Sequence, residues 1–160
     1  MKKVDVEKAK AAIAKAEKIA IVTHYNPDGD AIGSSLALYN FMENEGKTVD
    51  AIIPNRFPDF LEWMPNSEKV LVADGHLSQV KKVLKEADLI FVVDMNAPHR
   101  AGRDIENLLL KSKAHKTLID HHIHPEIDCD VMHSCVKTTS ASELVYDFLY
   151  KYLKYLLNEQ

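Results

Sequence analysis

The chain has 160 residues, a net charge of −4 and an ordinary apolar content of 46%, as expected for one globular domain. A net negative charge argues against a protein surface that is basic enough to bind a long nucleic-acid duplex. A nucleic-acid substrate would therefore be short or bound at one local site. The absence of a transmembrane run, a secretory signal and a disulfide framework predicts a cytoplasmic protein without membrane contact, whose cysteines, Cys129 and Cys135, stay reduced.

Apolar periodicity divides the chain into alternating helical and strand-like segments. In chain order we predict a helix over 5–18, strand 19–23, helix 31–45, strands 48–54 and 69–74, helix 77–86, strand 87–94, helix 101–112, strand 115–120 and helix 140–157. Strands separated by helices favour a parallel sheet, and continuous apolar strand runs indicate burial on both sides. The predicted fold class is therefore α/β, a doubly wound, mainly parallel sheet with helices on both faces.

Carboxylates and imidazoles follow three of the predicted strands. They are His24, Asp28 and Asp30 after strand 19–23, Asp94 at the end of strand 87–94, and Asp120, His121 and His122 at the end of strand 115–120. Ligands of open parallel sheets bind beyond the carboxyl ends of the strands, so these side chains are expected to converge. Asp74 also ends a strand-like run, but the Gly75-His76 that follows is typical of a turn, and Asp74 is left out of the predicted site.

Such a cluster of acids predicts bound metal ions. Like charges a few ångströms apart raise each other's pKa, and divalent cations remove that conflict. Mixed carboxylate and imidazole ligands suit Mn²⁺, with Mg²⁺ or Co²⁺ as alternatives, and the ligands are too many for one tetrahedral zinc. Two metals sharing a carboxylate would clamp a phosphoryl group and lower the pKa of a bridging water.

Other interpretations of the first motif were weighed. Taken alone, Asp28-Gly29-Asp30 also suits a turn and a helix cap. A calcium loop is excluded because the twelfth position counted from Asp28 is Tyr39 and not glutamate. Gly29 and Gly33 do not form the G-x-G-x-x-G pattern, which argues against a dinucleotide-binding oxidoreductase domain. The joint occurrence at three strand ends favours the metal site.

Three stretches, THYNPDGDAIGSSLAL, VVDMNAPHRAG and LIDHH, resemble the first three motifs of the DHH phosphoesterase superfamily. The resemblance runs over essentially the whole chain. It is strongest to the bifunctional oligoribonucleases that also remove the 3′-phosphate from pAp, and weaker to RecJ exonucleases, cyclic-dinucleotide phosphodiesterases and family II inorganic pyrophosphatases. Membership implies two manganese ions per complete site and hydrolysis of a phosphoester.

The resemblance implies a role for each motif residue. His24 and Asp28 would bind one metal, Asp30 and His121 would bind the other, and Asp94 would bridge the two.

The remaining motif residues would act beside the metals. Asp120 would orient a neighbouring imidazole, and His122 would act near the scissile phosphate, donating to an oxygen or helping the leaving group. Arg100 would either bind phosphate or tie down its loop. Ser34, at the start of a helix, would either help to bind an anion or only pack the helix.

The resemblance also implies elements that this sequence does not show. A fourth motif with a further metal-binding aspartate would lie just beyond helix 140–157, and a C-terminal substrate domain with a Gly-Gly-His motif would follow it. We therefore expect residues 1–160 to be the DHH phosphoesterase domain of a longer protein, ending before the fourth motif, and to be weak or inactive alone.

The expected function is a manganese-dependent phosphoesterase acting on short single-stranded RNA or on pAp-like nucleotides. The alternatives are a cyclic-dinucleotide phosphodiesterase and a non-catalytic module that binds metal and nucleotide. Residues 146–157 carry many aromatic and leucine side chains. They either support a homodimer or cover the sheet, and covering the sheet is the preferred interpretation.

Overall fold

The computed structural model describes residues 3–157, and it places side chains from residue 5 to residue 152. The helices are α1 (Lys3–Lys15), α2 (Gly29–Asn44), α3 (Leu77–Glu86), α4 (Arg103–Lys111) and α5 (Ala141–Leu157). The strands are β1 (Lys18–Val22), β2 (Thr48–Ile53), β3 (Leu71–Val72), β4 (Leu89–Val93), β5 (His115–Asp120) and β6 (Val131–Ser134). Short 3₁₀ turns occupy Asp59–Leu61, Ser67–Lys69 and Pro98–Ala101.

Within the described residues the strands form one sheet of six, in the order β3-β2-β1-β4-β5-β6, and every pair is parallel. The chain moves outward from β1 to β3, then returns to β4 beside β1 and moves outward to the other edge. The carboxyl ends of β1 and β4 therefore flank the point where the strand order reverses, which is where open α/β sheets form a ligand crevice. The predicted doubly wound parallel fold is confirmed.

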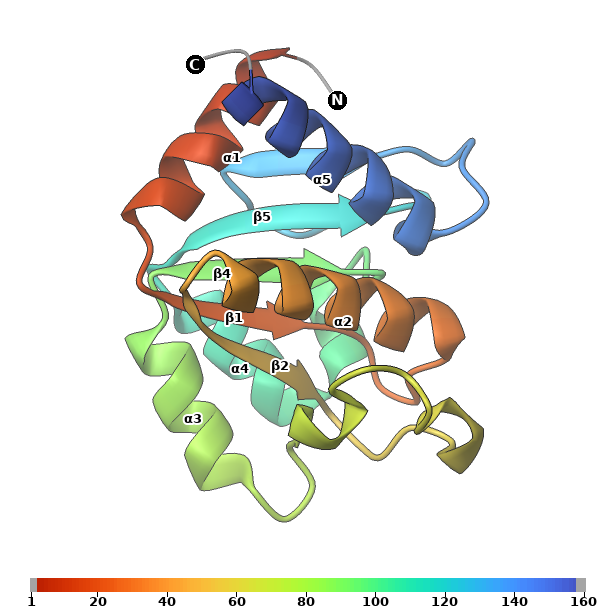
Figure 1. Cartoon of the computed structure of the whole chain (residues 1–160). Coiled ribbons are helices and arrows are strands. Elements are labelled where there is room, and N and C mark those ends of the chain that lie inside the picture. The colour runs from red at the N-terminus through yellow and green to blue at the C-terminus, as the bar shows by residue number, and fades with distance from the viewer. Residues whose placement is uncertain (1–2, 158–160) are drawn as a thin grey trace.

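Helices cover both faces of the sheet. α1, α2 and α5 lie on one face, and α3 and α4 lie on the other (Figure 1). Alternate residues of β1 serve the two layers: Ile19 and Ile21 pack under α1, α2 and α5, while Ala20 and Val22 pack against α3 and α4. Burial on both sides explains why the strands read as continuous apolar runs.

The helix expected over 5–18 ends at Lys15, and Lys18 already begins β1. Three further segments differ from the prediction. Strand β6 was not predicted, because its sequence Val-Met-His-Ser alternates buried and half-exposed positions at the sheet edge and has no apolar run. Strand β3 is shorter than predicted, because the 3₁₀ turn Ser67–Lys69 occupies the start of the expected segment. The helix expected over 101–112 begins at Arg103, because Gly102 with φ of 78° separates it from the turn before it.

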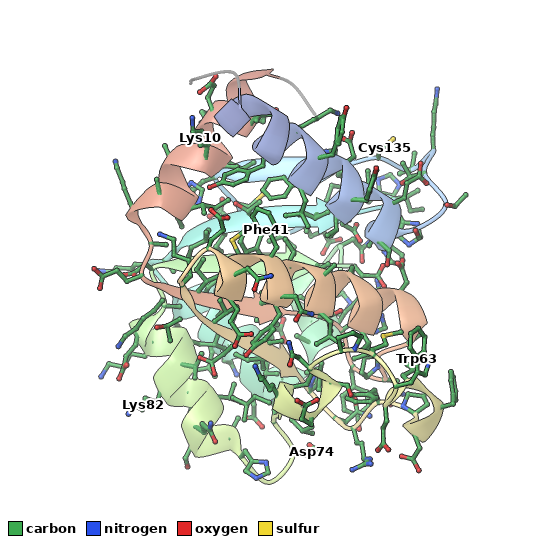
Figure 2. All side chains as sticks on the ribbon, viewed as in Figure 1. Lys10, Phe41, Trp63, Asp74, Lys82 and Cys135 are labelled. Carbon is green, nitrogen blue, oxygen red and sulfur yellow. The ribbon has the colours of Figure 1, made fainter. Side chains whose placement is uncertain are left out.

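Helix α5 packs its apolar face on the sheet and on α2. Phe148 is buried and meets Phe91 of β4 edge to face, with ring centroids 5.9 Å apart. Phe41 of α2 lies between α2 and α5 (Figure 2) and meets Tyr152 in the same way at 5.6 Å. The side chains of residues 153–157 lie outside the described residues, and a homodimer formed through 146–157 stays a prediction. Between residues 3 and 157, no helix is both long enough and apolar enough to cross a bilayer.

Replacing Phe148 by alanine should destabilise the fold by about 3–5 kcal/mol, because it removes a fully buried ring and leaves a cavity against Phe91. Urea unfolding followed by circular dichroism measures this loss. The control is Tyr146→Ala on the same helix, whose side chain is 71% exposed and should change stability by less than about 0.5 kcal/mol. Equal effects of both substitutions would contradict the packing of α5 described above.

Candidate metal centre

The carboxyl ends of β1, β4 and β5 bring the predicted acids and imidazoles together. One group is Asp94, His121 and His122, the other is His24, Asp28 and Asp94, and within each group the ligand atoms lie within 4.8 Å of one another. Asp94 belongs to both groups, with one oxygen 3.5 Å from His24 Nε2 and the other 3.3 Å from His121 Nε2. The convergence follows from the sheet order, since β4 lies between β1 and β5.

Asp94 is the centre of the cluster. Its side chain is only 3% exposed, and its Oδ1 has no hydrogen-bond partner among the described residues. Its backbone is left-handed, with φ of 55°, and its N–H donates to the carbonyl of Ile119 at 3.0 Å. A non-glycine residue in this conformation costs on the order of 1 kcal/mol and persists only where its surroundings enforce it. A buried carboxylate oxygen without a donor is what a divalent cation would satisfy, so this donor set fits a metal.

His24 presents its Nε2 to Asp94. Its Nδ1 lies 2.8 Å from the carbonyl of Tyr25, and because a carbonyl only accepts, the Nδ1 hydrogen donates there. Burial lowers the pKa of His24, but the hydrogen bonds to Asp94 and to the Tyr25 carbonyl outweigh burial and the Arg100 charge, so the pKa lies above its ordinary value. An imidazole held by its Nδ1–H has the orientation of a metal ligand that binds through Nε2.

Asp28 combines the two roles that were weighed from the sequence. It is the N-cap of α2, and its Oδ1 accepts hydrogen bonds from the N–H groups of Asp30 and Ala31 at 3.0 Å each. Its Oδ2 accepts no hydrogen bond from the described residues. The cap therefore uses one oxygen and leaves the other available to a metal.

Asp30 differs from the other predicted ligands because its carboxylate caps α5. Its Oδ2 accepts from Ala141 N–H at 2.7 Å, and its Oδ1 accepts from Ser142 N–H at 2.8 Å and from the Ser142 hydroxyl at 2.6 Å. The same Oδ2 lies 3.6 Å from His121 Nε2. This contact was not predicted, because it spans 111 residues and has no local signal beyond the capping residues at the start of α5.

Asp120 and His122 form a tightly bonded pair. Asp120 is fully buried, its Oδ1 accepts from His122 Nδ1 at 2.7 Å, and its Oδ2 accepts from the His122 backbone N–H at 3.0 Å. These bonds fix Nδ1 as the donor and leave Nε2 of the partly exposed imidazole free. The rings of His121 and His122 meet at 4.7 Å between centroids.

The two predicted substrate-binding residues lie at different depths. Ser34 is buried inside α2, where its hydroxyl donates to the carbonyl of Asp30 at 2.6 Å, so the structure places it in helix packing. Arg100 is half-buried; its Nη1 donates to Asn96 Oδ1 at 3.4 Å, and its carbonyl accepts from Tyr25 N–H at 2.7 Å. Arg100 thus holds its own loop, and its charge also acts on His24 at the centre, so a role in binding phosphate stays a prediction beside the structural role.

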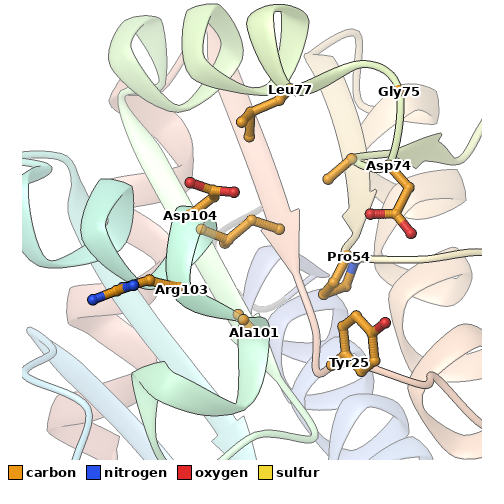
Figure 3. Close-up of a pocket in the computed structure, with 11 residues that line it drawn as sticks. Tyr25, Pro54, Asp74, Gly75, Leu77, Ala101, Arg103 and Asp104 are labelled. Atoms are coloured by element: carbon orange, nitrogen blue, oxygen red, sulfur yellow. The ribbon is translucent and has the colours of Figure 1, made fainter.

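A cavity of about 290 Å³ lies next to the centre, between the ends of the strands and the starts of α3 and α4 (Figure 3). Its wall includes Tyr25, Asp74 and Asp104. This cavity was not predicted from the sequence. The available signals were an aromatic residue directly after His24 and a further aspartate, Asp74, at a strand end.

Curated proteins similar to this chain include three hydrolases. The chain is 34% identical over 105 residues to the bifunctional oligoribonuclease and PAP phosphatase NrnA of Thermus thermophilus, covering 65% of this chain and 28% of that protein. It is 29% identical over 145 residues to the cyclic-di-AMP phosphodiesterase GdpP of Geobacillus thermodenitrificans, covering 86% and 22%. It is 28% identical over 111 residues to a probable manganese-dependent inorganic pyrophosphatase of Lactobacillus acidophilus, covering 66% and 31%. The chain thus spans less than a third of these relatives.

Solved structures share the fold. An exopolyphosphatase-related protein from Bacteroides fragilis superposes with a TM-score of 0.92 at 39% identity, covering 94% of this chain and 44% of that one. RecJ from Thermus thermophilus, solved in complex with Mn²⁺, shares the fold alone, with a TM-score of 0.58 at 15% identity, covering 95% and 21%. The family model described as DHH family, N-terminal domain, matches residues 18–160. Because that match covers most of the sequence, the chain belongs to the DHH family.

Proposed function

We propose that this chain is the metal-binding domain of a manganese-dependent phosphoesterase that hydrolyses short oligoribonucleotides, pAp-like 3′-phosphonucleotides or both. The observation that carries the proposal is the buried Oδ1 of Asp94, which has no donor in the described structure and lies among imidazole and carboxylate groups. The relatives named for phosphoester or phosphoanhydride hydrolysis support the reaction class, and the relative named as probably manganese-dependent supports the metal.

In this proposal the two groups that share Asp94 hold two ions. His24 and Asp28 would serve one ion, and His121 would serve the other. Asp30 lies outside both groups, but its Oδ2 is 3.6 Å from His121 Nε2, so it would join the second ion while also holding the start of α5. When bound, the ions neutralise phosphate charge and lower the pKa of a water.

Two residues beside the metals are proposed to act on the phosphate. Asp120 accepts from His122 Nδ1–H and stabilises the ring when it is protonated, and the Nε2–H of that imidazolium would donate its proton to a phosphate oxygen or to the leaving oxygen. The guanidinium of Arg100 has a single long hydrogen bond, to Asn96, and keeps donors for a phosphate oxygen.

Two other functions fit the same centre. A cyclic-dinucleotide phosphodiesterase is favoured by the match to GdpP, which covers 86% of the chain. A non-catalytic metal- and nucleotide-binding module would keep the cluster but hydrolyse nothing. The phosphodiesterase would differ from the main proposal in its preferred substrate. The non-catalytic module would differ from it in having no turnover.

The central test compares this chain with the same chain extended past Gln160. Each is given Mn²⁺ and 5′-labelled pApA, pAp or cyclic di-AMP, and the products are separated by chromatography. We expect the extended chain to release AMP from pApA and from pAp and residues 1–160 to be much slower. Faster cleavage of cyclic di-AMP would favour the phosphodiesterase alternative. Absence of turnover in both chains, with manganese bound normally, would favour the non-catalytic module.

Replacing Asp94 by asparagine should lower Mn²⁺ affinity by more than about 100-fold, because the carboxylate belongs to both groups and outer partners of metal ligands alone cost 10–100-fold. Isothermal titration of Mn²⁺ into the purified protein measures this change. The control is Asp128→Asn, which removes an exposed carboxylate outside both groups. Unchanged stoichiometry and affinity in the Asp94 variant would contradict a bridging role.

Replacing Asp120 by asparagine should lower kcat/KM for pApA by about 10–100-fold in the extended chain, because the charge that holds His122 is lost. Mn²⁺ stoichiometry should not change, since Asp120 is in neither group. The matched control is Asp130→Asn, whose carboxylate also accepts a backbone N–H, that of Lys116, outside the centre. Loss of manganese with full activity on reloading would show that Asp120 serves the metal instead.

A further inference from the structure

The cavity beside the metal centre has an apolar floor and an acidic rim. Buried side chains at Pro54, Ala73, Ala101 and Ile105 line the floor. Figure 3 shows Asp104 and Asp74 on opposite sides of the opening, with the Tyr25 ring below them and the Arg103 side chain directed away. At about 290 Å³ the cavity lies at the lower end of the range for small-molecule sites, which suits a single ring system.

The groups on the rim are free to meet a ligand. Tyr25 is 51% exposed, although it is a large aromatic residue that directly follows the buried His24. Within the described part of the chain, the carboxylates of Asp74 and Asp104 make neither an ion pair nor a side-chain hydrogen bond. The rim therefore offers an aromatic face and hydrogen-bond acceptors, but it repels phosphate.

The cavity and the metal centre share one wall. Tyr25 gives its carbonyl to the His24 imidazole at 2.8 Å while its ring lines the cavity. The turn at 98–102 also borders both sites, since the Arg100 charge acts on His24 while Ala101 and Gly102 line the cavity. The metal centre and the cavity are thus neighbours, separated by Tyr25 and the turn at 98–102.

We propose that this cavity receives the base of the substrate nucleotide, and that it selects bases with an exocyclic amino group. This inference rests on the phosphoesterase proposed above. The Tyr25 ring would stack on the base, as aromatic side chains do in single-strand binding proteins. Carboxylates accept hydrogen bonds from amino groups such as cytosine N4, and adenine and guanine carry such groups while uracil does not. A bare cation would use the acids but leave the apolar floor and the ring without a function.

Binding of nucleotides to residues 1–160 with Mn²⁺ tests the proposal. Isothermal titration should show AMP and CMP binding at least about 10-fold more tightly than ribose 5-phosphate, which has no base, and more tightly than UMP. Tyr25→Ala should weaken AMP by about 5–100-fold, in line with stacking on one base, and leave ribose 5-phosphate unchanged. Tyr25→Phe, which keeps the ring, should bind AMP like the parent protein.

The acidic rim has its own test. The double substitution Asp74→Asn with Asp104→Asn should abolish the preference for AMP over UMP. The matched controls are Tyr150→Ala, an exposed tyrosine on α5, and Asp128→Asn, and both should retain the parent preferences.

Failure of the pocket and failure of the enzyme can be told apart. Bis(p-nitrophenyl) phosphate has no base, so its hydrolysis by the extended chain reports on the centre alone. Hydrolysis of this compound, combined with AMP binding no tighter than ribose 5-phosphate, would overturn the base pocket and keep the phosphoesterase. Base-dependent binding without hydrolysis would keep the pocket as a nucleotide site and remove the catalytic function. A Tyr25→Ala variant that loses AMP and ribose 5-phosphate equally would also overturn the pocket.

Discussion

The buried carboxylate of Asp94 is the constraint on which the rest of the site depends. It lies at the end of the central strand β4, in a left-handed turn, with one oxygen that no donor in the described structure satisfies. Keeping such a group costs free energy twice, once for desolvation and once for backbone strain. The proposed cation would offset this cost, and the imidazoles that follow the flanking strands, His24 and His121, lie 3.5 and 3.3 Å from the two Asp94 oxygens, where they would share it.

The other acids avoid this penalty because each one also has a structural hydrogen bond. Asp28 caps α2, Asp30 caps α5, and Asp120 accepts from the backbone and the ring of His122. The starts of helices carry partial positive charge, so two of the carboxylates are stabilised by helix dipoles before any metal binds. The cluster can therefore fold with limited repulsion, and its unpaired charge is concentrated on Asp94.

The sequence was sufficient to predict that the acids and imidazoles meet at one edge of the sheet. It was not sufficient to predict which of them also accept structural hydrogen bonds. Continuous apolar runs predicted the strands, and a parallel sheet brings residues such as Asp94 and His121 to one edge whatever the details. The cap that Asp30 makes on α5 joins residues 111 apart and needs the folded helix layer to exist. Strand β6 has no apolar run that would predict it. The cavity forms where three strand ends meet two helix starts, so no local sequence pattern predicts the cavity either.

The single wall between centre and cavity has a consequence for selectivity. Gly102, with φ of 78°, lies beside the Tyr25 ring: a Cβ added there would be at ordinary contact distance, 3.9 Å, from the ring. Tyr25 N–H is bonded to the Arg100 carbonyl, and Tyr25 C=O to the His24 ring. Both bonds are made by the Tyr25 backbone, so a shift of that backbone would displace the ring and the metal-facing imidazole together, whereas removal of the ring alone leaves both bonds in place. If the cavity binds the base as proposed, the same backbone would position base and phosphate. A base that fits the cavity poorly would then also hold its phosphate poorly, and selectivity would affect the rate as well as binding.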